Sequence, residues 1–189
     1  DAKGLLTRAQ MAAIVSRAFG AAKTASLDDY RDVLPSAWYY SDMGKAVKMG
    51  AFQGANGLLN PDAPITRAEF AAIAARFDDK NTNNTSNFSD IASHWAKDEI
   101  GVAANKGWIN GYPDGTFRPN QYITRAEAMT LVNRVLNRLP ENSSDLLDSM
   151  IKWPDNSDAS AWYYLAVQEA TNSHTYTKSG THETWKKLR

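Results

Sequence analysis

The tetrapeptide Thr-Arg-Ala-Glu at residues 66–69 decides the fold, because the chain contains nearly the same four residues three times. Thr-Arg-Ala-Gln occurs at residues 7–10 and Thr-Arg-Ala-Glu again at residues 124–127, which spaces the three arginines by 59 and 58 residues. Self-similarity at a nearly fixed spacing is typical of proteins built from repeated structural units. The sequence therefore predicts three copies of one unit.

Each copy of the tetrapeptide has the features of a helix start. Thr66 is a favourable N-cap residue, and Glu69 three positions later completes a capping box. Ile65 before the cap and Phe70 after it have the spacing of a hydrophobic staple. Apolar residues then recur at helical spacing in all three copies: Met11, Ile14, Val15 and Ala18; Phe70, Ile73, Ala74 and Phe77; Ala128, Leu131, Val132 and Val135. We expect three equivalent helices packed around one axis.

Two further elements recur upstream of the tetrapeptide. A second predicted helix is marked by an aspartate followed by a tryptophan, in the pairs Asp32 and Trp38, Asp90 and Trp95, and Asp155 and Trp162. A loop rich in glycine and proline follows this helix in two copies, at residues 50–61 and 107–119. The repeating unit is thus an Asp…Trp helix, a glycine-rich loop and a Thr-Arg-Ala-Glu helix.

The repeats divide the chain into complete and incomplete copies. Residues 30–77 and 88–138 are complete repeats, residues 1–29 hold the second half of a truncated repeat, and residues 153–189 hold the first half of a final, degenerate repeat. The two incomplete segments together could make a third, circularly permuted unit. We therefore expect residues 1–189 to form one compact, closed three-fold arrangement with its chain ends close together.

Two linkers interrupt the repeats, and no region is rich in predicted strands. Residues 78–87 are polar and are predicted to be unstructured. Residues 141–151 could form a short amphipathic helix.

Composition excludes several classes of function. The 189 residues include 21 Lys and Arg and 21 Asp and Glu, so the formal net charge is zero. This balance argues against a sequence-independent nucleic-acid binder and against a polybasic membrane-surface module. The absence of cysteine excludes disulfides, Cys-ligated zinc and cysteine nucleophiles. Without a run of about 18 apolar residues we expect no membrane insertion, and the first residues lack the features of a signal peptide.

Two stretches of the chain resemble a known family. Residues 110–119 read Asn-Gly-Tyr-Pro-Asp-Gly-Thr-Phe-Arg-Pro and precede Ile-Thr-Arg-Ala-Glu at residues 123–127, while Phe-Ser-Asp-Ile at residues 88–91 precedes His-Trp-Ala at residues 94–96. These motifs resemble the S-layer homology (SLH) family, and the resemblance covers nearly the whole chain. It implies a mainly α fold, a pseudo-three-fold SLH trimer. Its central helices would come from the Thr-Arg-Ala-Glu segments, with the Trp helices and glycine-rich loops at the periphery.

The same resemblance implies a function. Members of the family anchor larger surface proteins non-covalently to secondary cell wall polysaccharide, often bearing pyruvate ketals, through grooves between neighbouring modules. For this chain it implies an extracellular location at the bacterial cell wall or S-layer, an acidic or pyruvylated glycan as partner, and a monomer that is itself a pseudo-trimer. The alternative is a helical-repeat module for protein–protein interaction or for self-assembly of the surface layer.

The chain departs from the family pattern at three places. The first copy has Gln10 where the others have Glu. The second repeat has Gln-Gly-Ala-Asn-Gly at residues 53–57 where the third has Asn-Gly-Tyr-Pro-Asp-Gly at residues 110–115. Near the end, Thr-His-Glu-Thr at residues 181–184 is a poor echo of the tetrapeptide, with His182 in place of the arginine.

The motif arginines are the first candidates for ligand contact. A cation at the first helical position is unfavourable by about 0.3–1 kcal/mol, because the helix dipole is positive there. A bound carboxylate would compensate for it, since the arginine and free backbone N–H groups would converge on the same anion. Arg67 and Arg125 are the best candidates, followed by Arg8. The structural alternative is that each arginine pairs with an acid of the next module, such as Asp32 or Asp90.

Aromatic side chains are the second set of candidates. Trp38, Trp95 and Trp162 could present a flat apolar face to the C–H groups of a sugar and one N–H donor. A tryptophan near a helix start is more often a wedge in the core, and the pattern favours that interpretation. Tyr112, at a loop tip, is better placed to touch a ligand.

Glycines and aspartates of the loops complete the candidate ligand-binding residues. Gly54, Gly111 and Gly115 allow close approach of the backbone, so that their N–H groups could bind sugar hydroxyls, or they could serve only as tight connectors. Asp32 and Asp90 could accept hydroxyl hydrogens from a ligand or cap the following turn, and the pattern favours the structural role.

Nothing in the sequence indicates catalysis or a cofactor. The acidic residues recur with the repeat, as scaffold residues do, instead of forming the pair that a glycosidase needs. His94, His174 and His182 lack the spacing of metal ligands, and no nucleophile-elbow or phosphate-binding glycine motif occurs. We therefore expect a non-enzymatic protein with no metal and no cofactor.

Overall fold

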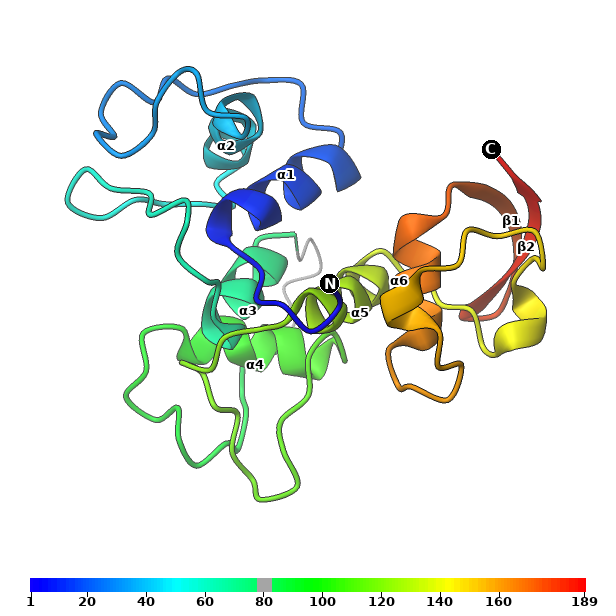
Figure 1. Cartoon of the computed structure of the whole chain (residues 1–189). Coiled ribbons are helices and arrows are strands. Elements are labelled where there is room, and N and C mark those ends of the chain that lie inside the picture. The colour runs from blue at the N-terminus through cyan, green and yellow to red at the C-terminus, as the bar shows by residue number, and fades with distance from the viewer. Residues whose placement is uncertain (78–82) are drawn as a thin grey trace. The chain divides into compact units, whose positions relative to one another are not determined.

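The computed structural model describes residues 1–77 and 83–189, which form a mainly α fold (Figure 1). The helices and strands are α1 (Arg8–Ala18), α2 (Tyr40–Lys48), α3 (Arg67–Ala75), α4 (Lys97–Asn105), α5 (Arg125–Val135), the 3₁₀ turns η1 (Ser143–Asp145) and η2 (Pro154–Asn156), α6 (Tyr164–Thr171), β1 (His174–Ser179) and β2 (His182–Leu188). The described helices are all too short or too polar to cross a membrane.

The chain divides into two compact units. Residues 5–123 form one unit, and residues 1–4 together with 124–189 form the other. In the first unit α1 packs against α2 and α3 against α4, while in the second α5 packs against α6. Each Thr-Arg-Ala helix therefore packs on the tryptophan helix that follows it in the chain, which belongs to the next repeat.

The three Thr-Arg-Ala helices begin where the sequence predicts. The side chains of Thr7, Thr66 and Thr124 each accept a hydrogen bond from the backbone N–H three residues later. In return, the side-chain oxygens of Gln10, Glu69 and Glu127 accept from the backbone N–H of these threonines. These reciprocal bonds satisfy two backbone donors that a helix start otherwise leaves unpaired. The prediction of three capping boxes is confirmed.

A closed ring of three backbone hydrogen bonds joins the segments that lead into these helices. The N–H of Leu6 donates to the carbonyl of Ile123 at 3.2 Å, that of Ile123 to Ile65 at 3.1 Å, and that of Ile65 back to Leu6 at 2.8 Å. All three side chains are buried. The ring lies within residues 5–123 and connects the three copies of the repeat through their residues just before the threonine caps.

The first unit also shows where a predicted apolar stripe ends. Helix α3 stops at Ala75, so Phe77, expected to continue the stripe, lies just beyond it. Its ring stacks on that of Phe19 at 4.0 Å between centroids.

The C-terminal segment differs from the sequence prediction, because it contains a β-hairpin. Strands β1 and β2 pair antiparallel, with Ser179 opposite His182. Residues 181–184 therefore form the hairpin turn and the start of β2, and the interpretation of this stretch as an echo of the helix motif is wrong. The β-branched and aromatic residues Thr175, Tyr176 and Thr177 favour a strand here.

The structure bears differently on the predictions for the two linkers. Of the polar linker at residues 78–87, residues 78–82 lie outside the described part, and residues 83–87 form neither helix nor strand. The expected amphipathic helix at residues 141–151 is wrong, since only the single turn η1 forms there.

Candidate functional site

The backbone amides at the start of each Thr-Arg-Ala helix are already bonded within the protein. In α1 the N–H of Arg8 donates to Ala63 at 2.9 Å and that of Ala9 to Pro61 at 2.8 Å. The equivalent bonds in the other two helices run from Arg67 to Gln121, Ala68 to Pro119, Arg125 to Gly4 and Ala126 to Ala2. Since the threonine cap binds the third amide, the expectation of free N–H groups that converge on a carboxylate is wrong.

Arg8 points into the loop of the following repeat. Its Nε donates to the carbonyl of Leu59 at 2.8 Å, and its Nη1 pairs with Oε1 of Glu69 at 2.5 Å. The guanidinium also lies 5.1 Å from the centre of the Phe52 ring. The acid that pairs with Arg8 is therefore the glutamate of the next Thr-Arg-Ala-Glu copy, and not Asp32 as the structural alternative expected.

Arg67 occupies the equivalent position in the next repeat and is buried. Its Nε donates to the carbonyl of Phe117 at 2.8 Å and its Nη2 to that of Asn110 at 2.6 Å. Its guanidinium lies 4.9 Å from the ring centre of Tyr112, so this ring lies against the arginine. The guanidinium of Arg118 lies 3.9 Å from the same ring.

Arg125 differs from the other two motif arginines. Its side chain is only partly buried. Within the described part of the chain it makes no side-chain hydrogen bond or ion pair, although its backbone is held like theirs. Of the three motif guanidinium groups, this one is the least committed to internal contacts.

Asp32 and Asp90 clamp the loops that receive Arg8 and Arg67. The carboxylate of Asp32 accepts from the N–H groups of Leu59 and Asn60, and that of Asp90 accepts from Phe117 and Arg118 at 2.8 Å each. Burial by itself raises the pKa of Asp90, but these backbone N–H groups outweigh it and lower the pKa overall. The geometry matches the structural role that the sequence favoured.

The three candidate glycines serve the loops in two ways. A Cβ atom at Gly54 would lie 2.2 Å from Cε1 of Tyr30, and one at Gly111 would lie 2.1 Å from Cε1 of Phe88. These two positions therefore have no room for a side chain. Gly115 has a φ of +80° and open space around it, so its conformation rather than its surroundings requires glycine.

The motif tryptophans are exposed, so the interpretation of them as core wedges is wrong. Their relative exposures are 64% for Trp38, 65% for Trp95 and 66% for Trp162. The residue after each tryptophan turns inward instead: Tyr39 and Ala96 are buried, and Tyr163 is partly buried. Two of the indoles lie edge-on against the following tyrosine, with interplanar angles of 87° and 88°.

A groove of about 630 Å³ brings several of these residues together in the first unit. Its walls come from the start of α1, the loop at residues 51–64, one face of α3, Trp95 and Tyr122. Among the predicted residues it unites Arg8, Gly54 and Trp95. The equivalent loop of the next repeat contains Gly111 and Tyr112, and Arg67 lies against Tyr112. Trp38 does not line the groove.

Sequence reasoning missed three residues of the groove. Glu69 was assigned only to helix capping, and Tyr122 and Arg76 were not considered. Arg76 donates from Nη1 to the carbonyl of Ala51, which holds it against the groove wall. The sequence difference between residues 53–57 and residues 110–115 was a signal for the groove. The first loop has Ala55 where the next repeat has Tyr112, so it lacks the ring that lies against the arginine in that repeat.

Two segments of the chain match a known domain family. Residues 29–71 and 87–129 each match the S-layer homology domain. The chain is 34% identical to cell surface glycoprotein 1 of Acetivibrio thermocellus over 97% of its own length and 8% of that protein. It is 33% identical to the cellulosome-anchoring protein of the same organism over 90% of its length and 39% of that protein.

A shorter match extends to another group of organisms. Over 55 residues, 29% of the chain, it is 49% identical to outer membrane protein SlpA of Thermus thermophilus, covering 6% of that protein. The chain thus spans well under half of the length of each of these relatives. The domain matches and the cell-surface relatives indicate an extracellular location associated with the cell wall. With two SLH domains in tandem, the chain belongs to the S-layer homology family.

Proposed function

We propose that this chain anchors a surface protein non-covalently to the bacterial cell wall by binding an acidic, pyruvylated secondary cell wall polysaccharide. Its SLH domains and its relatives, one of them named as a cellulosome-anchoring protein, support cell-wall anchoring by a non-catalytic module. The choice of an acidic glycan rests on the residues of the groove.

The observation that carries the proposal is the combination of cations and an exposed indole in one groove. Its charged lining residues are Arg8, Arg76 and Glu69, which leave one net positive charge. A carboxylate on the glycan would therefore be attracted, and it would share Arg8 with Glu69. Trp95 offers its ring face to the C–H groups of a sugar at the same site.

We extend the proposal to the other motif arginines. Arg125, partly exposed and without an internal side-chain partner among the described residues, would contact the acidic group of a second saccharide. Arg67 would act with Tyr112, whose ring lies against it. Several weak sites on one chain raise retention on a polymer, because each bound site increases the effective concentration of ligand at the next.

The compact pseudo-three-fold arrangement and its monomeric state are also part of the proposal. The closed ring through Leu6, Ile65 and Ile123 supports it, because three segments in a cycle occupy equivalent positions. In this arrangement residues 1–29, 30–77, 88–138 and 153–189 supply the modules.

A matched pair of tryptophan variants tests the groove. Trp38 and Trp95 are equally exposed at equivalent helix starts, but only Trp95 lines the groove. Trp95→Ala should weaken sedimentation of the chain with purified cell wall by about threefold to tenfold, from the loss of about 0.5–1.5 kcal/mol of aromatic contact. Trp38→Ala should leave it unchanged. Equal losses in both variants would instead favour a protein-interaction surface made of the exposed indoles.

A change to the polymer tests the acidic group. Mild acid treatment removes pyruvate ketals from the wall, and retention of the wild-type chain should fall after it. Retention that stays the same would contradict the carboxylate part of the proposal while leaving wall anchoring intact.

A further inference from the structure

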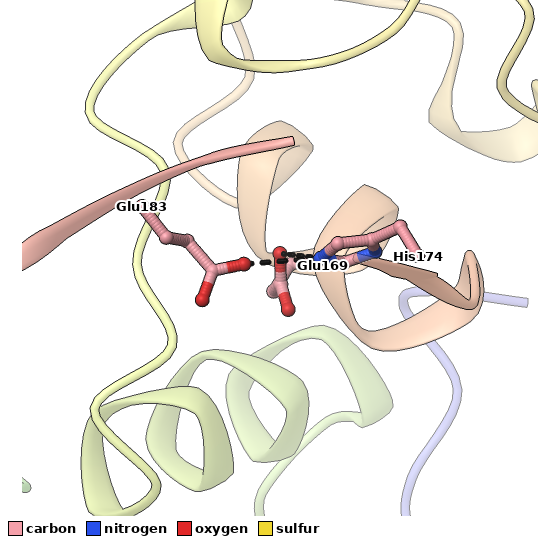
Figure 2. A group of neighbouring side chains, drawn as sticks. All are labelled: Glu169, His174 and Glu183. Carbon is pink, nitrogen blue, oxygen red and sulfur yellow. Dashed lines mark hydrogen bonds and ion pairs between the residues drawn. The ribbon is translucent and has the colours of Figure 1, made fainter. Parts of the chain in front are cut away.

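The second unit contains a buried cluster of ionisable side chains that the anchoring function does not use (Figure 2). Glu169 comes from α6, His174 from the start of β1 and Glu183 from β2, and their side chains are at most 3% exposed. Arg138, which follows α5, reaches the same cluster and is 27% exposed. Three separate elements therefore meet at one set of charges.

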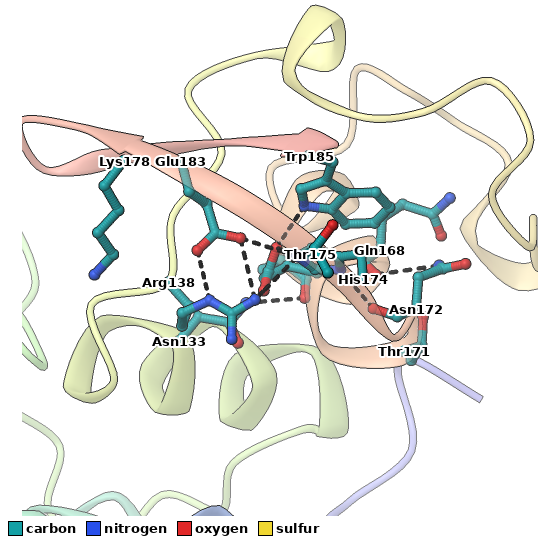
Figure 3. Close-up of polar contacts among 12 residues, drawn as sticks. Asn133, Arg138, Gln168, Thr171, Asn172, His174, Thr175, Lys178, Glu183 and Trp185 are labelled. Atoms are coloured by element: carbon teal, nitrogen blue, oxygen red, sulfur yellow. Dashed lines mark hydrogen bonds and ion pairs between the residues drawn. The ribbon is translucent and has the colours of Figure 1, made fainter. Parts of the chain in front are cut away.

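Every carboxylate oxygen and imidazole nitrogen of the cluster has a close partner (Figure 3). Arg138 binds Oε1 of Glu169 from Nη2 at 2.7 Å and Oε2 of Glu183 from Nε at 2.5 Å. Nε2 of His174 lies 3.0 Å from Oε1 of Glu183 and 3.3 Å from Oε2 of Glu169. Trp185 donates from Nε1 to Oε2 of Glu169 at 2.8 Å.

The balance of charge in this cluster requires one additional proton. Two ionised carboxylates and one guanidinium leave a net charge of minus one in a site that excludes water, and such an uncompensated buried charge is strongly disfavoured. One proton on either Glu169 or His174 makes the cluster neutral. Both locations give the same total charge, so the proton can be shared between the two groups.

The hydrogen bonds of His174 define where that proton can reside. Its Nδ1 lies 2.7 Å from the carbonyl of Asn172 and must donate to it. The remaining nitrogen, Nε2, lies 2.9 Å from Nη2 of Arg138, a donor. A neutral imidazole accepts from the arginine, and the extra proton is then on Glu169, whereas a charged imidazole donates to the carboxylates instead.

The surroundings of Glu169 favour its protonated form. Burial, together with the neighbouring carboxyl of Glu183, raises the pKa of Glu169 to about 7. Burial also raises the pKa of Glu183, but the hydrogen bonds from Arg138 outweigh it and lower that pKa overall. The pKa values of the two carboxyl groups therefore differ, and Glu169 is the one that binds a proton more readily.

The other charged groups on the packed elements do not supply a second cation. The ring of Tyr176, which lies on β1, is 4.1 Å from the guanidinium of Arg138. Lys178, also on β1, donates to the carbonyl of Asn137, and Asp145 of η1 accepts from the hydroxyl of Thr184. Glu169, His174 and Glu183 place their ligand atoms within 4.8 Å of one another, yet the positive charge among them is that of Arg138.

The cluster is also the main polar attachment of the hairpin to α6. Trp185 is buried, stacks on His174 at 3.9 Å between centroids and donates to Glu169. The N–H of Glu183 donates to the carbonyl of Leu139, next to Arg138. A charge left uncompensated at Glu169 would therefore act directly on the contact between β2 and α6.

We propose that this cluster is a proton-dependent latch: it binds one proton between Glu169 and His174, and loss of that proton as pH rises loosens the hairpin β1–β2 from α6. The device is independent of the glycan groove, which is made of residues 5–123. It gives the C-terminal segment a stability that depends on the acidity of its surroundings.

Hydrogen exchange of the whole chain tests the latch. After correction for intrinsic exchange rates, protection of the amides of residues 174–188 should fall by about twofold between pH 6 and pH 8, because folded Glu169 releases its proton with a pKa of about 7, while the opened chain releases that of an ordinary histidine with a pKa of about 6.5. In Glu169→Gln, an uncharged mimic of the protonated side chain, protection should instead rise by about fourfold, because the opened chain still loses the histidine proton and the folded cluster has none to lose. Glu141→Gln, at an exposed carboxylate of the same unit, should behave like the wild type.

Three results would overturn the proposal. One is a Glu169→Gln variant that keeps the wild-type pH dependence. Another is a wild-type chain in which neither the carboxyl carbon of Glu169 nor the ring carbons of His174 titrate between pH 5 and pH 8 by nuclear magnetic resonance, a measurement that needs no variant to fold. The third is stabilisation of the hairpin by added Zn²⁺ that a chelator reverses, because the cluster would then bind a metal ion in place of the proton.

Discussion

Arg8, the first residue of α1, forms an ion pair with Glu69, the third residue of α3, at 2.5 Å. The same glutamate caps its own helix through the N–H of Thr66. The carboxylate of Glu69 thus caps the helix of its own repeat and also binds the arginine of the preceding copy. It therefore links two repeats.

Glu69→Gln isolates this coupling. Glutamine can still complete the capping box, so the variant should lose only the charge-assisted bond to Arg8, about 1–2 kcal/mol of unfolding free energy in urea titrations. Glu127→Gln is the matched control, since Glu127 caps α5 without an ion pair to any described residue. If both variants lose the same stability, the ion pair contributes nothing of its own.

Alanine substitution should lower the stability of the protein at Arg67 but not at Arg125. Arg67→Ala leaves the carbonyl of the buried Phe117 and that of the exposed Asn110 without this donor and should cost about 1–3 kcal/mol of stability. Arg125→Ala should stay within about 0.5 kcal/mol of the wild type, because no internal partner is lost among the described residues. The second variant can therefore be used in wall-binding assays, and normal binding would remove Arg125 from the proposed ligand contacts.

Gly54→Ala should destabilise the first unit by about 1–3 kcal/mol, because its methyl group overlaps the ring of Tyr30. Calorimetric melting would measure the loss. A double variant that also carries Tyr30→Ala should recover part of it, since the smaller side chain removes the overlap. Failure of the second change to recover any stability would show that the glycine is needed for another reason.

Asp90 predicts an acid-sensitive contribution to stability. Its folded-state pKa is lowered below the ordinary 3.8, so the stabilisation it provides is present above that value and is lost as pH falls through the folded pKa. Asp90→Asn should therefore weaken the first unit at neutral pH and flatten its stability profile below pH 4. Asp29→Asn, at an exposed aspartate elsewhere in the same unit, should leave that profile unchanged.

The local features of the fold were predictable from the sequence, and the groove was not. Threonine caps such as Thr66 depend on residues three positions apart, which the sequence displays directly. The groove depends on Trp95 and Tyr122 lining the same hollow as Arg8, and only the folded chain brings these residues together.

Two errors have identifiable physical causes. At two of the three Trp helices the tryptophan is followed by a tyrosine, and in the first of them Tyr39 rather than Trp38 took the buried position. At residues 181–184 a partial match to the helix motif outweighed the alternating pattern of the flanking residues. The ion cluster around Glu169 was missed because Arg138, His174 and Glu183 show no sequence spacing typical of a site.

The hydrogen-bonded ring through Leu6, Ile65 and Ile123 has a consequence for how the protein is made. Each bond joins segments more than fifty residues apart, so none is local. A nascent chain on the ribosome cannot complete the cycle until Ile123 has left the exit tunnel, and earlier segments must wait with their donors bonded to water. Assembly of the first unit should therefore be late, slow for a helical protein and strongly concerted.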